Sequence, residues 1–258
     1  MNRAKNAENI NNSLLILNEK WQRSFDEQMR AMGLTDWENV YSSPFFAAVS
    51  SEEWEKDGRG LVMFLGEEAR NWWFDKTTKM EDIQAFAIQY IREQLGHLPA
   101  KKNRSPFWNV IRAISKSGYS IAWNNLDKYH RRDPIKKSTL VLNRNYYEEE
   151  MALHRATVNG KTLLLAEIEQ IAPDYIICLG KTYRDALISA LMLPPDTPLP
   201  TPELQSGRTV VDITAYCTTL TASNPRIKVL WICHPAAFSF RGLYRESVAN
   251  ILEKLETN

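Results

Sequence analysis

The chain has 258 residues, of which 44% are hydrophobic and 24% are charged, a balance typical of a globular protein with one large core or two modest ones. A formal net charge of +1 excludes a protein coated in basic charge, although a local patch can still bind a polyanion. No apolar run reaches the length of a membrane span, and the polar start MNRAKNAENINNS carries no signal-peptide pattern, so we expect a cytoplasmic protein.

Residues 6–31 have the pattern of a helix. Apolar side chains recur there at helical spacing, and a glycine follows as a stop signal: Leu14, Leu17, Trp21, Phe25, Met29 and Gly33. Residues 1–59 are therefore interpreted as a helical N-terminal extension, and residues 60–258 as the main domain.

From residue 61 the pattern changes, because short apolar runs of strand length alternate with helical patterns. Strands are predicted at residues 61–65, 119–123, 174–180 and 227–233, with a further possible strand at 208–213. Helices are predicted at residues 80–95, 105–118, 162–172, 181–192 and 244–256. Apolar strands separated by helices predict a three-layer α/β/α fold whose central sheet is mostly parallel and has about four strands.

The residues that directly follow the strands are the most informative ones, because parallel sheets bind ligands at the carboxyl ends of their strands. These segments are GEEARNWW after Leu65, NNLDKYHRRD after Trp123, GKTY after Leu179 and HPAAFSFRG after Cys233. Each motif is short, so the order and spacing of all four carry more weight than any one of them.

This ordered set resembles the motifs of the uracil-DNA glycosylase superfamily over residues 61 to about 255. Members of that superfamily have a first motif Gly-Gln-Asp-Pro-Tyr or Gly-(Ile/Leu)-Asn-Pro-Gly, a strand ending in Asn, a hydrophobic strand ending in Leu-Gly, and a last motif His-Pro-Ser-Pro. The corresponding segments here are GEEAR, AWNNLDK, PDYIICLGKTYRDAL and HPAAFSFRG, and SPFWNVIRAISKSG resembles the family's Phe-Trp segment.

The resemblance implies a DNA glycosylase, a hydrolase that flips a base out of DNA and cleaves its N-glycosidic bond to leave an abasic site. Ala69 replaces the family's proline and Arg70 stands where a pocket residue is expected, so the substrate is expected to be a modified or damaged pyrimidine rather than plain uracil. Base excision repair and defence against phage DNA with modified cytosines both fit such an activity.

Two catalytic roles are assigned from the resemblance. Glu68 is the candidate carboxylate beside the sugar, and Glu67 competes for that role because an alignment slip of one residue exchanges them. His234 is the candidate donor to the base O2 atom, on which negative charge develops as the bond breaks.

Recognition of the base is assigned to an amide and an aromatic ring. Asn124 or Asn125 is expected to pair with the Watson–Crick edge of the base, although both asparagines could instead cap the next segment. Among the aromatic residues that follow the first strand, Trp73 or Phe74 is expected to stack on the base. Gly66 and Arg70 complete the expected base-binding set.

Contact with DNA is assigned to a wedge and to cations. Phe238 is either a wedge that fills the gap left by the flipped base or an ordinary core residue, and Arg241 is expected to contact the DNA backbone. Further cations close to the strand ends are expected to bind phosphate: Lys128, Arg131, Arg132 and Lys181.

No cofactor or metal ion is expected. The cysteines Cys178, Cys217 and Cys233 contain no C-x-x-C pair, and they are too few for the four-cysteine iron–sulfur site of one branch of the superfamily. The competing interpretation is a catalytically inactive module on the same fold that binds nucleic acid or a protein partner, with the N-terminal helical segment as its docking element.

Overall fold

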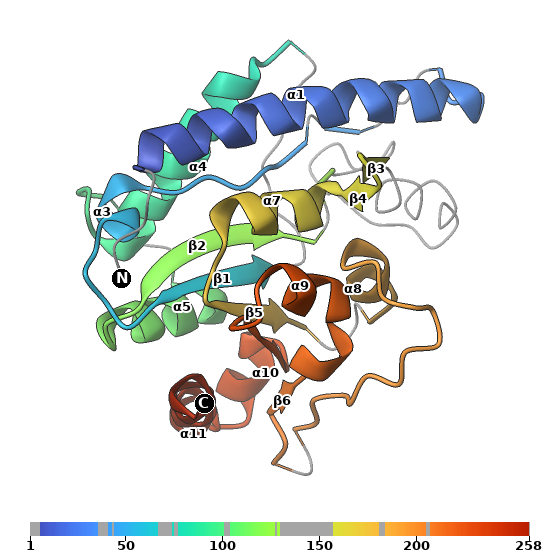
Figure 1. The fold of residues 1–258 in the computed structure, drawn as a ribbon. Coiled ribbons are helices and arrows are strands. Elements are labelled where there is room, and N and C mark those ends of the chain that lie inside the picture. The colour runs from blue at the N-terminus through green and yellow to red at the C-terminus, as the bar shows by residue number, and fades with distance from the viewer. Residues whose placement is uncertain are drawn as a thin grey trace.

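The computed structural model describes residues 6–35, 41–42, 44–66, 74, 77–100, 104–126, 128–129, 157–180, 184–204 and 207–257. Within these residues the chain forms a mixed α/β fold, in which a mostly parallel five-stranded sheet lies between helices (Figure 1). The predicted fold class is confirmed at this level, and the possible strand near residue 210 is the fifth strand of the sheet.

The central sheet has the strand order β2-β1-β5-β7-β6. Neighbouring strands are parallel except for β6, which runs antiparallel to β7. The strands are β1 (Leu61–Gly66), β2 (Ser120–Asn125), β5 (Tyr175–Leu179), β6 (Val210–Asp212) and β7 (Lys228–Ile232). The four parallel strands therefore end at one edge of the sheet, and they are the four strands whose following segments carry the motifs.

One face of the sheet is covered by helices that come from the beginning, the middle and the later part of the chain. They are α1 (Ala7–Ala31), α3 (Ser51–Trp54), α7 (Leu163–Ile171), α8 (Arg184–Ala190) and α9 (Thr218–Ser223), with a short 3-10 helix η3 (Thr214–Tyr216). Ile10 and Leu14 of α1 belong to the same buried cluster as Leu65 of β1. The described part of the N-terminal segment thus shares a core with the sheet.

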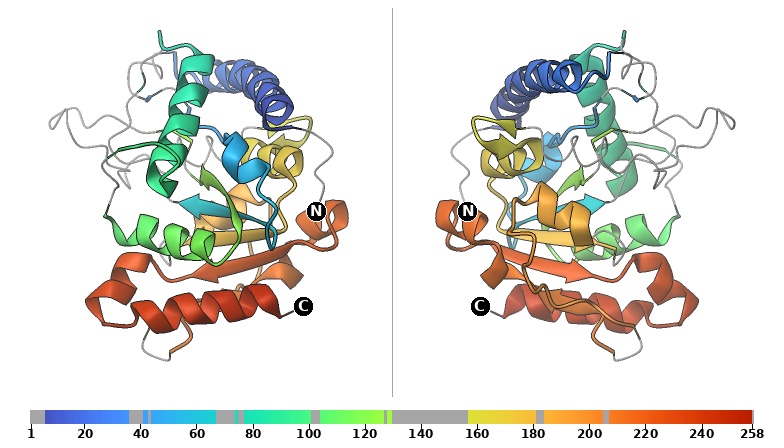
Figure 2. Two further views of the ribbon diagram at one scale, coloured as in Figure 1. Left: turned by 90° about the vertical axis from the view of Figure 1, so that its left-hand side faces the viewer. Right: turned by 90° about the vertical axis from the view of Figure 1, so that its right-hand side faces the viewer.

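The other face carries four further helices, which Figure 2 shows around and below the sheet. They are α4 (Met80–Leu95), α5 (Pro106–Lys116), α10 (Pro235–Phe240) and α11 (Tyr244–Glu256). Helix α5 begins as predicted, with Pro106 in its first turn and the Ser105 side chain accepting a hydrogen bond from the Trp108 amide. Trp108 then packs in the buried cluster beneath the sheet.

A small hairpin extends the layer of α1. It consists of β3 (Thr157–Val158) and β4 (Lys161–Thr162), and Ser24 of α1 donates a hydrogen bond to the Thr157 carbonyl over 3.1 Å. Next to it, Tyr129 stacks on Phe25 of α1 with the ring centres 4.8 Å apart. The chain that leaves β2 is therefore fixed to α1 by an aromatic contact.

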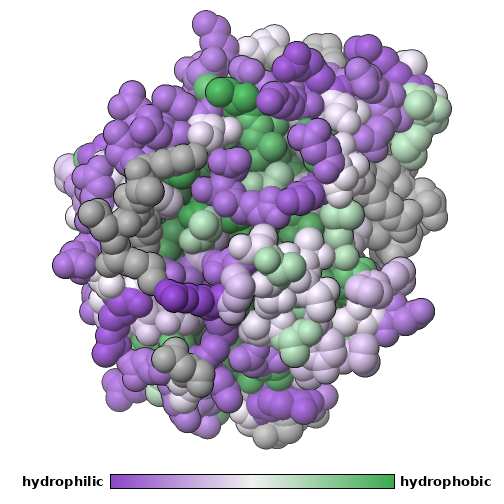
Figure 3. All heavy atoms as spheres, viewed as in Figure 1, coloured by the Kyte–Doolittle hydropathy of each residue, from purple (hydrophilic) through white to green (hydrophobic). Residues whose placement is uncertain are grey.

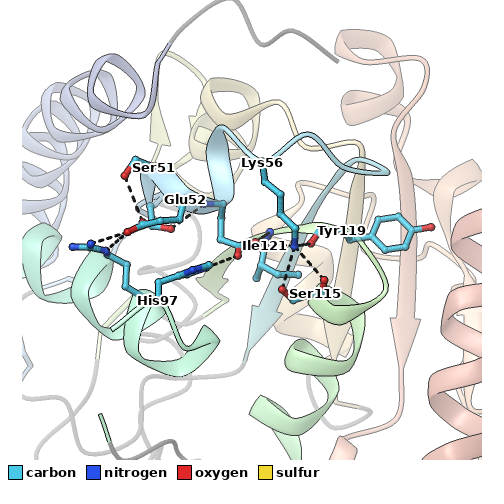
Figure 4. Close-up of polar contacts among 10 residues, drawn as sticks. Ser51, Glu52, Lys56, His97, Ser115, Tyr119 and Ile121 are labelled. Carbon is cyan, nitrogen blue, oxygen red and sulfur yellow. Dashed lines mark hydrogen bonds and ion pairs between the residues drawn. The ribbon is translucent and has the colours of Figure 1, made fainter. Parts of the chain in front are cut away.

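The edge strand β2 is closed by the segment that precedes β1. The Glu53 carboxylate on α3 accepts a hydrogen bond from the Ile121 amide over 2.8 Å, and its other oxygen lies 2.7 Å from His97 Nε2 (Figure 4). Lys56 donates hydrogen bonds to the carbonyls of Ser115 and Tyr119 on either side of the turn into β2. The Ile121 amide, a main-chain donor at the edge of the sheet, therefore has a hydrogen-bond partner in Glu53.

The surface seen in Figure 3 is mainly hydrophilic, and hydrophobic atoms show in the furrows between the polar side chains. None of the helices in the described part of the chain combines the length and the apolar character needed to cross a membrane.

Candidate functional site

The structure describes eight of the residues assigned to the site or to DNA contact: Gly66, Phe74, Asn124, Asn125, Lys128, His234, Phe238 and Arg241. The other assigned residues lie outside the described residues: Glu67, Glu68, Arg70, Trp73, Arg131, Arg132 and Lys181.

Asn125 is the last residue of β2, and it lies next to Gly66, the last residue of β1. Its side chain is fully buried (0% exposed), yet neither atom of its amide has a hydrogen-bond partner among the residues that the structure describes. A Cβ atom at position 66 would lie 2.7 Å from Asn125 Oδ1 and 3.4 Å from the ring of Phe107, so the amide of Asn125 and this ring both lie against Gly66. A buried amide without partners is costly, and such groups in native proteins often have a functional role.

Asn124 has the opposite environment, because all of its amide is used inside the protein. Its Nδ2 donates to Glu167 Oε2 over 2.8 Å, and its Oδ1 accepts hydrogen bonds from the Asn125 amide and from Lys128 Nζ. The side chains of adjacent strand residues point to opposite faces, so Asn124 faces α7 while Asn125 faces α5. Of the two asparagines, Asn125 is thus the one whose amide is unpaired within the described part of the chain.

His234 follows β7 and is the N-cap residue of α10. Its Nδ1 accepts a hydrogen bond from the Ala236 amide over 3.2 Å. A neutral imidazole that accepts at Nδ1 carries its proton at Nε2, so the cap selects the tautomer whose Nε2 is a donor. The ring is partly exposed, as a donor to an external ligand requires.

The sheet separates Asn125 from His234. Strands β1 and β5 lie between β2 and β7, so the two strand ends are roughly 14 Å apart at a spacing of about 4.8 Å per strand. A single ligand that contacts both side chains must therefore lie over the ends of β1 and β5. The structure brings Gly66 and Asn125 together directly, while His234 follows β7, on the far side of β5 from β1.

Phe74 belongs to a line of aromatic side chains that leads to the end of β2. Its ring meets Phe86 of α4 edge to face at 5.4 Å, Phe86 stacks on Tyr90 at 6.3 Å, and Tyr90 lies 5.7 Å from Trp123. Phe74 is partly exposed, so it can pack on α4 and still present ring surface. Its predicted stacking on a base stays a prediction.

The two phenylalanines of α10 lie on opposite faces of the helix. Phe238 is fully buried (0% exposed) in the cluster under the sheet, whereas Phe240 is 92% exposed. Residues two apart on a helix differ by about 200°, so one faces the core when the other faces solvent. The core interpretation of Phe238 is the one that fits, and its assignment as a wedge is corrected. Arg241 caps the helix beside Phe240 and is exposed, as expected for a residue that contacts a phosphate.

The assignment of Lys128 to DNA contact is also corrected. Its side chain is only 5% exposed, and its ammonium lies 2.5 Å from the Glu167 carboxylate. Burial lowers the pKa of Lys128, and the attraction of Glu167 partly opposes that shift. An ammonium held in this way does not reach a phosphate outside the protein.

Three residues near the predicted site were missed by the sequence reasoning: Phe107, Glu167 and Phe240. Phe107 lies within the Phe-Trp segment, and its ring contacts the position of Gly66. Glu167 stands three residues after Leu164 and four before Ile171, so it is an acidic residue on the apolar face of its helix, and that spacing is a readable signal. For Phe240 the sequence holds no signal that separates it from Phe238.

The three cysteines are buried, and none of them forms a disulfide within the described part of the chain. Burial and, to a lesser degree, the nearby Asp212 raise the pKa of Cys217 to about 12, and burial raises the pKa of Cys178 as well. Thiols in the neutral form are poor nucleophiles. The thiols of Cys178 and Cys217 are therefore not nucleophiles in the candidate chemistry.

A cavity of about 300 Å³ opens at the opposite, amino-terminal edge of the sheet. Its lining includes Pro173, which precedes β5, and Ile227, which precedes β7, and the Lys161–Glu169 ion pair lies beside it. None of the assigned residues that the structure describes lines this cavity.

Compared with known proteins, the chain matches no protein-family model and no curated protein sequence. A functional assignment therefore depends on the geometry of the strand ends and on the resemblance of the motifs that follow them.

Proposed function

We propose that this chain is a DNA glycosylase that hydrolyses the N-glycosidic bond of a flipped pyrimidine. The observation that carries the proposal is the buried amide of Asn125, which has no hydrogen-bond partner among the described residues and lies at the carboxyl edge of a parallel sheet. Ligands bind at that edge in open α/β sheets. A pyrimidine presents a donor and an acceptor on its Watson–Crick edge, and it would satisfy both atoms of this amide.

The order of the strands supports the proposal. The four segments that resemble glycosylase motifs follow β1, β2, β5 and β7, and these strands are consecutive neighbours in the sheet. A uracil-DNA glycosylase-like architecture is the finer fold assignment that we propose on this basis. The segments then surround one place, as a base pocket built from several motifs requires.

In the proposed reaction, one residue acts on the base and another acts on the sugar and the attacking water. The bond between the base nitrogen and the sugar C1′ atom breaks, the base leaves with the electron pair, and a water oxygen bonds to C1′. The imidazole of His234, with its proton on Nε2, donates to the base O2 atom as negative charge develops there. The carboxylate of Glu68, or of Glu67, takes the proton of the water and stabilises the cationic sugar.

The proposed substrate class is a modified or damaged pyrimidine in DNA, which fits base excision repair and anti-phage defence. Ala69 and Arg70 stand where the superfamily carries pocket residues, and such changes alter which base fits. The amide of Asn125 suits a uracil-like or a cytosine-like edge, since either end of it can donate or accept after a half turn. An assay with uracil and modified-cytosine substrates distinguishes between these bases.

The direct test is an assay for abasic sites on DNA that carries uracil, a thymine mismatch or a modified cytosine. We expect strand breaks after alkali on at least one of these substrates. Glu68→Gln and His234→Ala should lower the rate without preventing DNA binding. DNA binding without base release on any of the substrates would contradict the enzyme and would favour the catalytically inactive binding module.

Gly66→Ala tests the wall of the proposed pocket. The new Cβ atom would lie 2.7 Å from Asn125 Oδ1, which is too close, so the amide must move away from its place beside residue 66. Displacing a positioned group costs roughly 100-fold in rate, and we expect base release to fall by about that factor. A double-mutant cycle checks the cause, because Gly66→Ala should have no further effect in an Asn125→Ala background. Additive losses would place the effect of Gly66 elsewhere.

Phe240→Ala tests whether the exposed ring enters DNA. The side chain is 92% exposed, so its removal should leave the melting temperature unchanged. As a wedge it would hold the gap left by the flipped base, and we expect excision from duplex DNA to fall while excision from single strands is kept.

The matched control is Phe238→Ala on the opposite face of the same helix. Its ring is fully buried, and truncation should destabilise the protein by about 3–5 kcal/mol. Equal losses on duplex and single-stranded substrates in Phe240→Ala would reject the wedge.

A further inference from the structure

A buried polar cluster lies on the α7 side of β2, directly behind the proposed base-reading residue. At its centre is Glu167 of α7, which is fully buried. Its Oε2 accepts hydrogen bonds from Asn124 and Lys128, and its Oε1 accepts one from the Ala47 amide over 2.9 Å. Asn18 of α1 donates to the same Oε1 over 3.5 Å. The cluster thus connects α1, α7, the segment before α3 and the end of β2.

Three partners of Asn124 agree on one orientation of its amide. The Glu167 carboxylate only accepts, so it requires the Nδ2 end of the amide. The Lys128 ammonium and the Asn125 amide only donate, so both require the Oδ1 end. A half turn of the Asn124 amide would place its Nδ2 donor against the donors of Lys128 and the Asn125 backbone. It would also place its Oδ1 against the Glu167 carboxylate, and two acceptors repel each other.

The orientation of Asn124 determines the backbone at Asn125. The Asn125 amide donates to Asn124 Oδ1 over 2.8 Å, and the next amide, that of Leu126, donates to the Gly66 carbonyl over 2.9 Å. The peptide that carries the Asn125 side chain is therefore held from both sides. A side-chain amide that must meet a base needs such a fixed support.

Stability alone does not require charges at these positions. Well-packed apolar residues of similar volume usually stabilise a fold as well as a buried ion pair does, or better. What an apolar pair does not provide is a fixed direction for the Asn124 amide. We propose, on the basis of the proposed function, that Glu167 and Lys128 are positioning residues that orient the base-reading Asn125 through Asn124.

The test variant is designed to turn the side-chain amide of Asn124 by half a turn while the side-chain volumes in the cluster stay the same. In Glu167→Gln/Lys128→Met, the Gln oxygen is needed by the Ala47 amide, so the Gln nitrogen faces Asn124. Asn124 then turns its oxygen toward Gln and its nitrogen toward the Asn125 amide, which loses its acceptor. No unpaired buried charge is left, so the melting temperature should fall much less than in the single variant Lys128→Met, and only by what the lost acceptor of the Asn125 amide costs.

Two measurements follow the change. Hydrogen exchange of the Asn125 backbone amide should become about tenfold faster or more, while the Leu126 amide, bonded to Gly66, serves as an unchanged internal reference. Base release should fall by roughly 100-fold in kcat, because the reading amide is misplaced once the base is bound.

Glu53→Gln provides a matched control on the same strand. Glu53 is also a buried carboxylate that accepts a β2 amide, that of Ile121, but at the other end of the strand (Figure 4). This variant should lower the melting temperature and leave kcat and the exchange of the Asn125 amide unchanged.

Three outcomes are distinguishable. Unchanged exchange at Asn125 in the double variant overturns the positioning of that peptide by Asn124. Faster exchange with an unchanged kcat overturns its role in base reading. Absence of base release by the wild-type protein on every substrate rejects the proposed function itself, and with it the role of the cluster in that function.

Discussion

Asn125→Ala should lower the rate of base release by about 10⁴-fold while leaving the fold at least as stable as before. The amide is buried without a hydrogen-bond partner among the described residues, and such a group costs roughly 1–3 kcal/mol in the free protein. Its removal relieves that cost, which offsets the small cavity left behind. In this variant, a base that depends on the amide for recognition has no hydrogen-bond partner for its polar edge. An unpaired polar edge lowers kcat/KM by about 10⁴-fold.

The measurement pairs abasic-site formation with thermal unfolding. Asn124→Ala is the control, because it removes an amide of the same size whose groups are all bonded to Glu167, Lys128 and the Asn125 backbone. That control should lower the melting temperature clearly. If Asn125→Ala destabilises the protein as much as Asn124→Ala does, the free amide is a structural group and the proposed site is wrong.

Lys128→Met should destabilise the protein strongly and leave DNA contact unchanged. The substitution keeps the aliphatic stem but leaves the Glu167 carboxylate buried without its cation. Breaking a buried ion pair on one side costs about 3–5 kcal/mol, which corresponds to a decrease in melting temperature of roughly 10 °C for a chain of this size. Calorimetry of the two proteins at one pH measures it directly.

Salt dependence of DNA binding separates the buried lysine from a phosphate-binding one. A lysine on phosphate contributes about one unit to the slope of log affinity against log salt, so its loss flattens that slope. Lys128→Met should leave the slope unchanged, whereas Arg241→Ala, which removes an exposed cation, should reduce it. A flattened slope in Lys128→Met would mean that the ammonium leaves Glu167 to meet DNA.

The layout of the fold was predictable because its strands are apolar on both faces. The runs that became β1, β2, β5 and β7 are bounded by helical patterns, and that alternation determines a parallel sheet with helices on both sides. The packing of residues 6–31 was not predictable from periodicity. An apolar stripe indicates that a helix has a buried face, but it does not say that Leu14 meets the same core as Leu65.

The place of the candidate site in the fold was predictable from the sequence, but the identity of the residues that form it was less so. Strand ends identify Gly66, Asn125 and His234 because a parallel sheet gathers its carboxyl ends at one edge. Which of two adjacent asparagines has an amide without a partner among the described residues depends on Glu167, a residue 42 positions after Asn125 in the chain. Likewise, burial of Lys128 depends on a partner that local sequence does not reveal.

The closed edge at β2 has a consequence for self-association. A second copy of the chain that tried to extend the sheet at β2 would need the Ile121 amide, which already donates to Glu53, and would meet the bridge between Ala48 and Trp123. Strand-by-strand polymerisation is therefore blocked at this border of the sheet by the protein's own preceding segment.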